Sequence, residues 1–245
     1  MRMEKKVLAL AVLMATLYVP QARAANIEME PGQHAYDITV NGAPHRPGPT
    51  NTQLNTIAYD NSTATTSLAF SSTEVTTRTY GDELNLTATG ILSEMKFSIF
   101  NSGSSAGTLT GATVLINIYD AVTSANLGSF SSSVTFSTAL SAGFYSVVTA
   151  TNLDPLGINV NTTNVLVTQR ITAKTGAASR TGIVSLSPPS VGSSPAYFYQ
   201  SSGTVAAGFY TSASGAVNPV YQLSLAPPPV SARSTSWSRV KNLYR

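Results

Sequence analysis

The sequence predicts an all-β protein, an antiparallel two-sheet sandwich with a jelly-roll-like arrangement of strands. Apolar and polar residues alternate over many short segments, most regularly in residues 90–172, and a period of two is that of half-buried strands. Turn-forming Gly, Asn, Ser and Asp clusters recur about every ten residues between these segments, which is the spacing expected of a sandwich or barrel. No window before residue 230 keeps a helical period. These three observations together predict the fold class.

The expected strands follow one another along the chain from residue 68. Residues 90–172 contain a set that we expect to form a hairpin meander: 95–100, 112–119, 130–136, 145–153 and 165–168. Shorter candidates precede this set at 68–70, 75–80 and 84–87, and further strands follow at 183–186, 196–199, 205–210 and 220–225. Pro188 and Pro189 end the first of the later strands, because proline cannot donate to a strand ladder.

The first 24 residues have the pattern of a secretory signal peptide. Arg2, Lys5 and Lys6 form a positive start, residues 7–19 are an apolar run, and Pro20 precedes a small-x-small cleavage signature that ends at Ala24. The run has 13 residues, whereas a bilayer span needs about 20. We therefore expect cleavage after residue 24, no transmembrane segment after signal removal, and a mature chain that lies outside the cytoplasm.

Three further regions are expected after the signal peptide. Residues 25–66 read as an extended arm that adds an edge strand or two, because Pro44, Pro47 and Pro49 interrupt regular structure between two short alternating segments. Residues 67–226 form the predicted sandwich domain. Residues 227–245 begin with Pro227, Pro228 and Pro229, a stiff spacer, and continue into a basic and aromatic tail.

The distribution of charge argues against a nucleic-acid-binding protein. Residues 25–229 carry six basic and ten acidic side chains, a net charge of −4, whereas residues 230–245 carry four basic ones, a net charge of +4. A nucleic-acid binder has a basic face on its folded body, so we expect no such partner. The chain contains no cysteine, and its stability outside the cytoplasm must therefore come from the size of its core.

The tail is a candidate recognition element. It contains the only tryptophan of the chain, and as a helix it would place several apolar side chains together with a basic side opposite. The residues that we expect to carry recognition are Trp237, Val240, Lys241, Leu243, Tyr244 and Arg245. The alternative is a frayed terminus, because so short an isolated helix is marginal in water.

The block 90–225 resembles the bodies of secreted bacterial proteins that carry C-terminal sorting signals of the PEP-CTERM type. The resemblance rests on Phe-Ser-Ile-Phe-Asn-Ser-Gly at 97–103, Ile-Asn-Ile-Tyr-Asp at 116–120, Leu-Gly-Ser-Phe at 127–130 and Tyr-Gln-Leu-Ser-Leu at 221–225. Those proteins end in a Pro-Glu-Pro motif, an apolar span and a basic cluster, whereas this chain passes from its three prolines directly into the short tail.

The tail itself is similar to the Trp-x-x-Val/Ile-Lys-x-Leu-Tyr-Arg endings of other exported bacterial proteins of unassigned role. This second resemblance implies that the tail is an export or attachment signal, whose partner is the export or sorting machinery. Both resemblances imply a secreted protein or one held at the surface of a bacterium.

Catalytic chemistry has little support in the sequence. The only histidines, His34 and His45, lie in the proline-rich arm, where they are poor candidates for zinc ligands or for the base of a serine nucleophile. Paired carboxylates could hydrolyse a glycoside, and Glu94, Asp120 and Asp154 are the candidates near strand ends. We expect a protein that is not an enzyme, with glycoside hydrolysis as the least favoured alternative.

Calcium is the most credible ion, because it accepts oxygen ligands from irregular loops. Asp60, Asp82 and Glu83 are the candidate ligands. Ordinary turn chemistry explains the same residues, and Asp82 and Glu83 should point to opposite faces if they lie on a strand. We expect no other cofactor.

Carbohydrate binding is the main alternative to a purely structural role. Tyr197 and Tyr199 should share one face of a strand with Phe198 opposite, and Tyr210 and Tyr221 are candidate neighbours. Tyrosine rings can stack on sugars, although large aromatic side chains more often fill a sandwich interior or its rim. The preferred hypothesis is an exported non-enzymatic β-sandwich of the cell surface or extracellular matrix with a sorting or attachment tail, and the alternative is a carbohydrate-binding module that holds polysaccharide.

Overall fold

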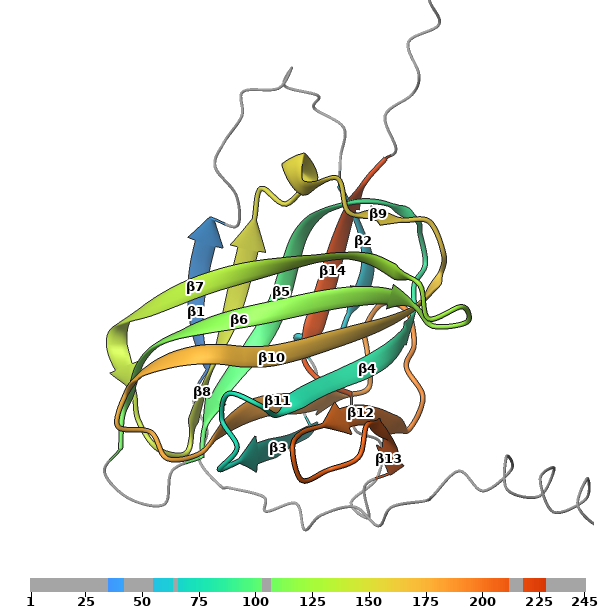
Figure 1. The fold of residues 1–245 in the computed structure, drawn as a ribbon. Coiled ribbons are helices and arrows are strands. Elements are labelled where there is room, and N and C mark those ends of the chain that lie inside the picture. The colour runs from blue at the N-terminus through green and yellow to red at the C-terminus, as the bar shows by residue number, and fades with distance from the viewer. Residues whose placement is uncertain (1–34, 42–54, 64–65, 103–106, 212–217, 228–245) are drawn as a thin grey trace, which may run out of the picture.

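A computed structural model describes residues 35–41, 55–63, 66–102, 107–211 and 218–227 (Figure 1). These residues form an antiparallel two-sheet sandwich that is not closed into a barrel, which confirms the predicted fold class. In the described part of the chain, one 3-10 turn, η1 (Asp154–Leu156), interrupts the strands. Within the described ranges, no helix is long and apolar enough to cross a membrane.

The six-stranded sheet forms the front layer in Figure 1. Its long strands β6, β7 and β10 lie next to one another, and the short hairpin β12–β13 forms its lower edge. In sheet order, the strands are β13 (Gly208–Thr211), β12 (Tyr197–Ser201), β4 (Thr79–Asn85), β10 (Asn164–Gly176), β6 (Leu109–Asp120) and β7 (Asn126–Leu140).

The eight-stranded sheet lies behind it (Figure 1). Its main path is β1 (Ala35–Asn41), β8 (Phe144–Thr151), β5 (Gly90–Asn101), β11 (Thr181–Ser187) and β3 (Thr66–Ser72). Strand β14 (Tyr221–Ala226) pairs with both β5 and β2 (Thr56–Asp60), and the short β9 (Asn159–Val160) also pairs with β5. All pairs are antiparallel except β1 with β8, which run parallel.

The core lies between the two sheets and follows directly from the alternation in the sequence. On β6, Val114, Ile116 and Ile118 are fully buried, while the residues between them are only half-buried. On β5, Met95 and Phe97 face the same interior from the other sheet. Each such side chain contributes about 1.5–3 kcal/mol on burial, so this large core explains how a chain without cysteine holds two sheets together.

The connections between strands differ from the expected meander. Strands β6 and β7 form a hairpin as expected, but β5 and β8 pair with each other in the opposite sheet. The chain therefore changes sheets between β5 and β6 and again between β7 and β8. Alternation predicts where a strand is and which side chains it buries, whereas it does not identify the neighbouring strand.

Two strands from the region expected to be an arm belong to the eight-stranded sheet. Strand β1 lies at one end of its path beside β8, and β2 pairs with β14. Tyr59 on β2 is completely buried in the core. These two strands cover edges of the sheet, as edge strands from an extended segment should.

Candidate functional site

The outer face of the six-stranded sheet carries a cluster of three aromatic rings, Tyr197, Tyr199 and Phe209, which we call the ring cluster. Tyr197 and Tyr199 alternate with buried Phe198 on β12, so both tyrosines point away from the core. Strand register places Phe209 of β13 directly opposite Tyr199. The cluster therefore combines the predicted tyrosine pair with a phenylalanine from the next strand.

The rings of the cluster contact one another edge to face. Phe209 lies 5.0 Å from Tyr197 and 5.7 Å from Tyr199 between ring centroids, with interplanar angles of 72° and 73°. This is a favoured geometry for aromatic pairs. Phe209 is 44% exposed and the two tyrosines are half-buried, so ring surface remains accessible on this face.

A carboxylate fixes one ring of the cluster. The Tyr197 hydroxyl donates a hydrogen bond to Glu83 on the adjacent strand β4, with 2.9 Å between Oη and Oε2. Partial burial raises the pKa of Tyr197, and the accepting Glu83 carboxylate raises it further, because both disfavour the phenolate. Tyr197 therefore stays a neutral hydroxyl, and Glu83 keeps a second oxygen next to the rings.

The inner face of the same hairpin anchors it to the core. Phe198 packs against Phe70, with 4.6 Å between ring centroids, and more loosely against Tyr210 at 6.4 Å. The Tyr210 hydroxyl donates to the Ala206 carbonyl at 2.5 Å. Tyr210 therefore stabilises the hairpin from inside and does not join the ring cluster.

The expectation that Tyr221 adjoins the tyrosine pair also needs correction. Tyr221 is fully buried on β14, a strand of the other sheet that is paired on both sides. Burial raises its pKa strongly, and the nearby Asp82 carboxylate adds to the shift. This residue contributes to the interior and offers no surface to a ligand.

A row of small and polar residues extends from the ring cluster across the sheet. Tyr199 pairs with Gly81, Gly81 with Thr168, and Thr168 with Asn117. The Asn117 amide donates to the Thr168 hydroxyl at 3.4 Å. A Cβ at Gly81 would lie 2.6 Å from the Val167 carbonyl oxygen, so the close approach of β10 requires glycine here.

Asp82 is buried inside the sandwich, although the sequence made it a candidate calcium ligand. Its exposure is 0%, and its Oδ2 accepts a hydrogen bond from Ser194 at 2.7 Å. Its Oδ1 and the hydroxyls of Tyr59 and Tyr221 are buried without a hydrogen-bond partner among the described residues. Burial raises the pKa of Asp82 well above its usual range, since a carboxylate is poorly solvated there.

The three candidate calcium ligands do not converge. Asp60 caps its own turn, because its Oδ1 accepts from the backbone and hydroxyl of Ser62 and its Oδ2 accepts from Gln222. Asp82 faces the interior and Glu83 the outer face, as expected for neighbours on a strand. Within the described ranges, no three His, Asp or Glu side chains are grouped so that they could hold a metal ion.

The candidate hydrolase carboxylates come from separate elements. Glu94 lies on β5 and Asp154 in η1, whereas Asp120 ends β6 in the other sheet. The Asp120 carboxylate accepts hydrogen bonds from the backbone of Thr123 and Val122, which lowers its pKa. Glu94 and Asp120 therefore lie in different sheets of the sandwich.

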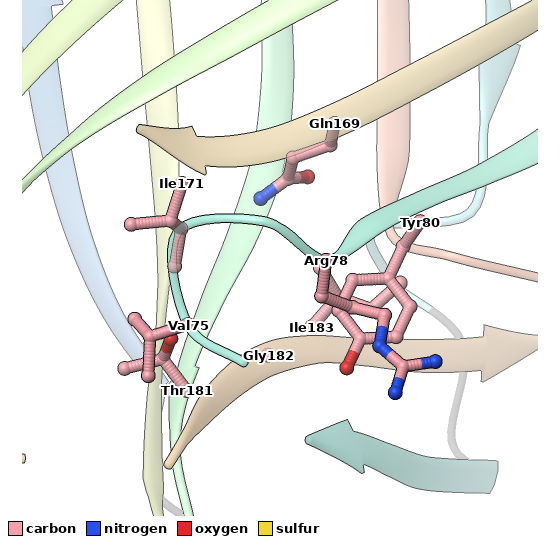
Figure 2. Close-up of a pocket in the computed structure, with 8 residues that line it drawn as sticks. All are labelled: Val75, Arg78, Tyr80, Gln169, Ile171, Thr181, Gly182 and Ile183. Atoms are coloured by element: carbon pink, nitrogen blue, oxygen red, sulfur yellow. The ribbon is translucent and has the colours of Figure 1, made fainter. Parts of the chain in front are cut away.

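A small pocket lies between β4, β10 and β11 (Figure 2). It contains about 200 Å³ of space, part of it open to solvent, and its interior accommodates about one water molecule. Arg78 Nε, Gln169 Oε1 and Thr181 Oγ1 are buried without a partner among the described residues, and each belongs to its lining. An ordered water in this pocket would satisfy these groups.

Other predicted site residues lie outside the described residues. These are the tail residues 237–245, together with His34 and His45 of the proline-rich region. Their expected roles stay predictions.

Comparison with protein-family models, with curated proteins and with solved structures finds no match for this chain. The functional argument therefore depends on the residues of the outer face themselves. Sequence reasoning named two of the three rings and missed Phe209. Its neighbour Tyr210 has the opposite orientation on β13, and only the strand register, which the sequence does not specify, distinguishes the two.

Proposed function

We propose that this protein is an exported, non-enzymatic β-sandwich of the bacterial cell surface or extracellular matrix, and that it binds polysaccharide through the ring cluster. The observation that carries the proposal is the accessible edge-to-face cluster of Tyr197, Tyr199 and Phe209 on a sheet face. Aromatic rings grouped on an exposed sheet face are typical of a site of interaction.

The chemistry of the cluster suits a sugar. A sugar ring offers apolar C–H faces to an aromatic ring and hydroxyls around its edge, and aromatic platforms can bind such a ligand with little loss of side-chain entropy. Glu83 accepts a hydrogen bond beside Tyr197, and the half-buried Asn117 supplies an amide further along the same face. The inner anchor of Phe198 and Phe70 keeps the hairpin rigid, so little ordering is needed on binding.

A glycan array followed by polysaccharide affinity electrophoresis tests the proposal. The mature full-length protein should bind a defined set of glycans. Tyr199→Ala and Phe209→Ala should each weaken binding at least about tenfold, because stacking of a sugar on an aromatic ring depends on the ring that each substitution removes. Val122→Ala, a substitution at an exposed turn residue away from the cluster, is the matched control and should leave binding unchanged. Binding that survives loss of both rings would contradict the proposal.

The tail is proposed to direct the protein to its destination. Its basic charge, its single tryptophan and its position after three prolines support a separate recognition element. Deleting residues 230–245 should leave the thermal unfolding temperature and glycan binding unchanged and should alter the distribution of the protein among cell, surface and medium fractions. A deletion variant that unfolds, or one that is distributed like the intact protein, would contradict this role.

A further inference from the structure

Arg170 lies on the same outer face as the ring cluster, and nothing among the described residues pairs with its charge. Arg170 lies on β10, and the strand register places it opposite Thr79 of β4 on one side and Leu115 of β6 on the other. Thr79 in turn lies opposite Ser201 of β12. Ser201 and Tyr199 are alternate residues of β12, so they share the outer face. Arg170 Nε is covered from solvent and has no hydrogen-bond partner in the described ranges.

The surroundings of Arg170 are neutral. Its neighbours on this face are the threonines and the leucine of adjacent positions. Glu83 is the described acid that shares the face; it lies four residues along β4 from Thr79, about 13 Å away by strand geometry, and it is bonded to Tyr197. The remaining described acids lie in the interior, at turns, in an ion pair with Arg78 or on the other sheet: Asp37, Asp60, Glu74, Asp82, Glu94, Asp120 and Asp154.

The ring cluster and Arg170 lie close together on the outer face. Arg170 is two strands from Tyr199, about 10 Å across the sheet, and two residues away along the strands, about 7 Å. Gly81 lies on the strand between Tyr199 and Thr168 and contributes no side chain there, and both Gly81 and Thr168 are buried. A flat ligand stacked on Tyr199 can therefore extend over Gly81 towards the guanidinium.

We infer that the polysaccharide is acidic and that a carboxylate of the sugar chain pairs with Arg170 while a neighbouring sugar unit stacks on Tyr199. This inference rests on the proposed function. A guanidinium binds a carboxylate through two parallel hydrogen bonds, which gives both energy and orientation. Glu83 repels a second carboxylate at the Tyr197 end of the face, so the charged edge of the ligand is directed towards Arg170.

Isothermal titration of the mature full-length protein tests the inference. The probes are polygalacturonate and alginate, each compared with its methyl-esterified form, which keeps the backbone and removes the charge. The charged forms should bind about tenfold more tightly, and Arg170→Gln should remove this advantage without changing affinity for the esters, as expected for loss of one charge-assisted pair. Arg170→Lys should retain an intermediate preference, because an ammonium attracts the anion without the bidentate geometry.

Lys96→Gln is the charge-matched control. Lys96 lies on β5 in the other sheet, so its loss should leave the preference for carboxylates intact. Equal affinity for charged and esterified forms, or an Arg170→Gln variant that binds both like the native protein, would overturn the inference and leave the proposed function standing. If neither the charged nor the esterified form binds, while a neutral glycan binds in a manner that requires Tyr199, the inference is likewise overturned. Failure of every glycan to bind overturns both the inference and the proposed function.

Discussion

Tyr197 and Glu83 form a hydrogen bond between two adjacent strands of the outer face, with 2.9 Å between the hydroxyl and the carboxylate oxygen. The register that pairs Tyr199 with Gly81 brings these two side chains opposite each other. The bond connects the short β12–β13 hairpin to the central part of the sheet. It holds one ring of the cluster while leaving the others free to contact a ligand.

The role of the ring can be separated from that of its hydroxyl. Tyr197→Phe keeps the aromatic surface and removes the bond to Glu83, so glycan affinity should stay within about threefold of the native value and the free energy of unfolding should fall by about 1 kcal/mol or less. Tyr197→Ala should lower affinity at least about tenfold. Titration calorimetry and urea denaturation check these values. Equal losses of affinity in the two variants would show that the hydroxyl, not the ring, is required.

The raised pKa of Asp82 predicts an unusual pH dependence of stability. An aspartate in the unfolded chain has a pKa of about 3.9, so above that pH the folded state holds a proton that the unfolded chain releases. The free energy of unfolding contributed by this residue is therefore highest below about pH 4 and falls as the pH rises through its folded-state pKa, by up to about 1.4 kcal/mol per pH unit.

Asp82→Asn should remove this dependence, because an amide does not titrate. The variant should gain stability relative to the native protein as the pH rises above about 4, and the gain should level off once Asp82 is ionised in the fold. Urea denaturation of both proteins from acidic to neutral pH measures the difference. Asp154→Asn, at an exposed position of η1, is the control, and a pH-independent difference for Asp82→Asn would contradict the prediction.

Asn61 connects two segments that are distant in sequence, its own and the one at 218–221. It is 0% exposed, its amide donates to the carbonyls of Asn218 and Pro219 at 2.9 and 2.8 Å, and its Oδ1 accepts from the Tyr221 backbone at 2.7 Å. Asn61→Ala should lower the free energy of unfolding by about 3 kcal/mol, because buried backbone groups lose their partner. Thermal and urea denaturation check this, and a loss as small as that of Asn85→Ala, at an exposed position, would contradict it.

Gly182 permits three strands to meet. Residues of β11 pair there with both β3 and β5, and a Cβ at this position would lie 1.6 Å from the Phe70 carbonyl oxygen. Gly182→Ala should therefore destabilise the protein by about 3 kcal/mol, since the backbone must move. Gly203→Ala, where a Cβ would meet nothing within 4 Å, should be nearly neutral. Comparable unfolding temperatures for the two variants would show that β3 can shift at little cost.

The alternation of residues predicts much of this structure. It correctly assigns the core side of β6 and the shared face of Tyr197 and Tyr199, because side-chain direction on a strand is a local property. The same rule separates Asp82 from Glu83. The position of Asp82 between the apolar Tyr80 and Leu84 on one face would have identified it as the buried member.

The remaining features depend on contacts between distant strands. The sequence could not indicate that Phe209 faces Tyr199, that β5 pairs with β8, or that β14 is covered on both sides and buries Tyr221. Each of these is a matter of register or strand order, which local patterning leaves open. The position of Arg170 on the same face as Tyr199 follows from the same long-range arrangement, so it too required the structure.

The pairing of β1 with β8 and of β2 with β14 has a consequence for how the chain folds. Ala35 pairs with Tyr145 and Asp60 with Gln222, so two strands that are synthesised early can pair only with strands that are synthesised much later. Such long-range closure is slow and leaves strand edges open to aggregation until it is complete. Strand β2 can therefore complete its pairing only after β14, the last described strand, has been synthesised.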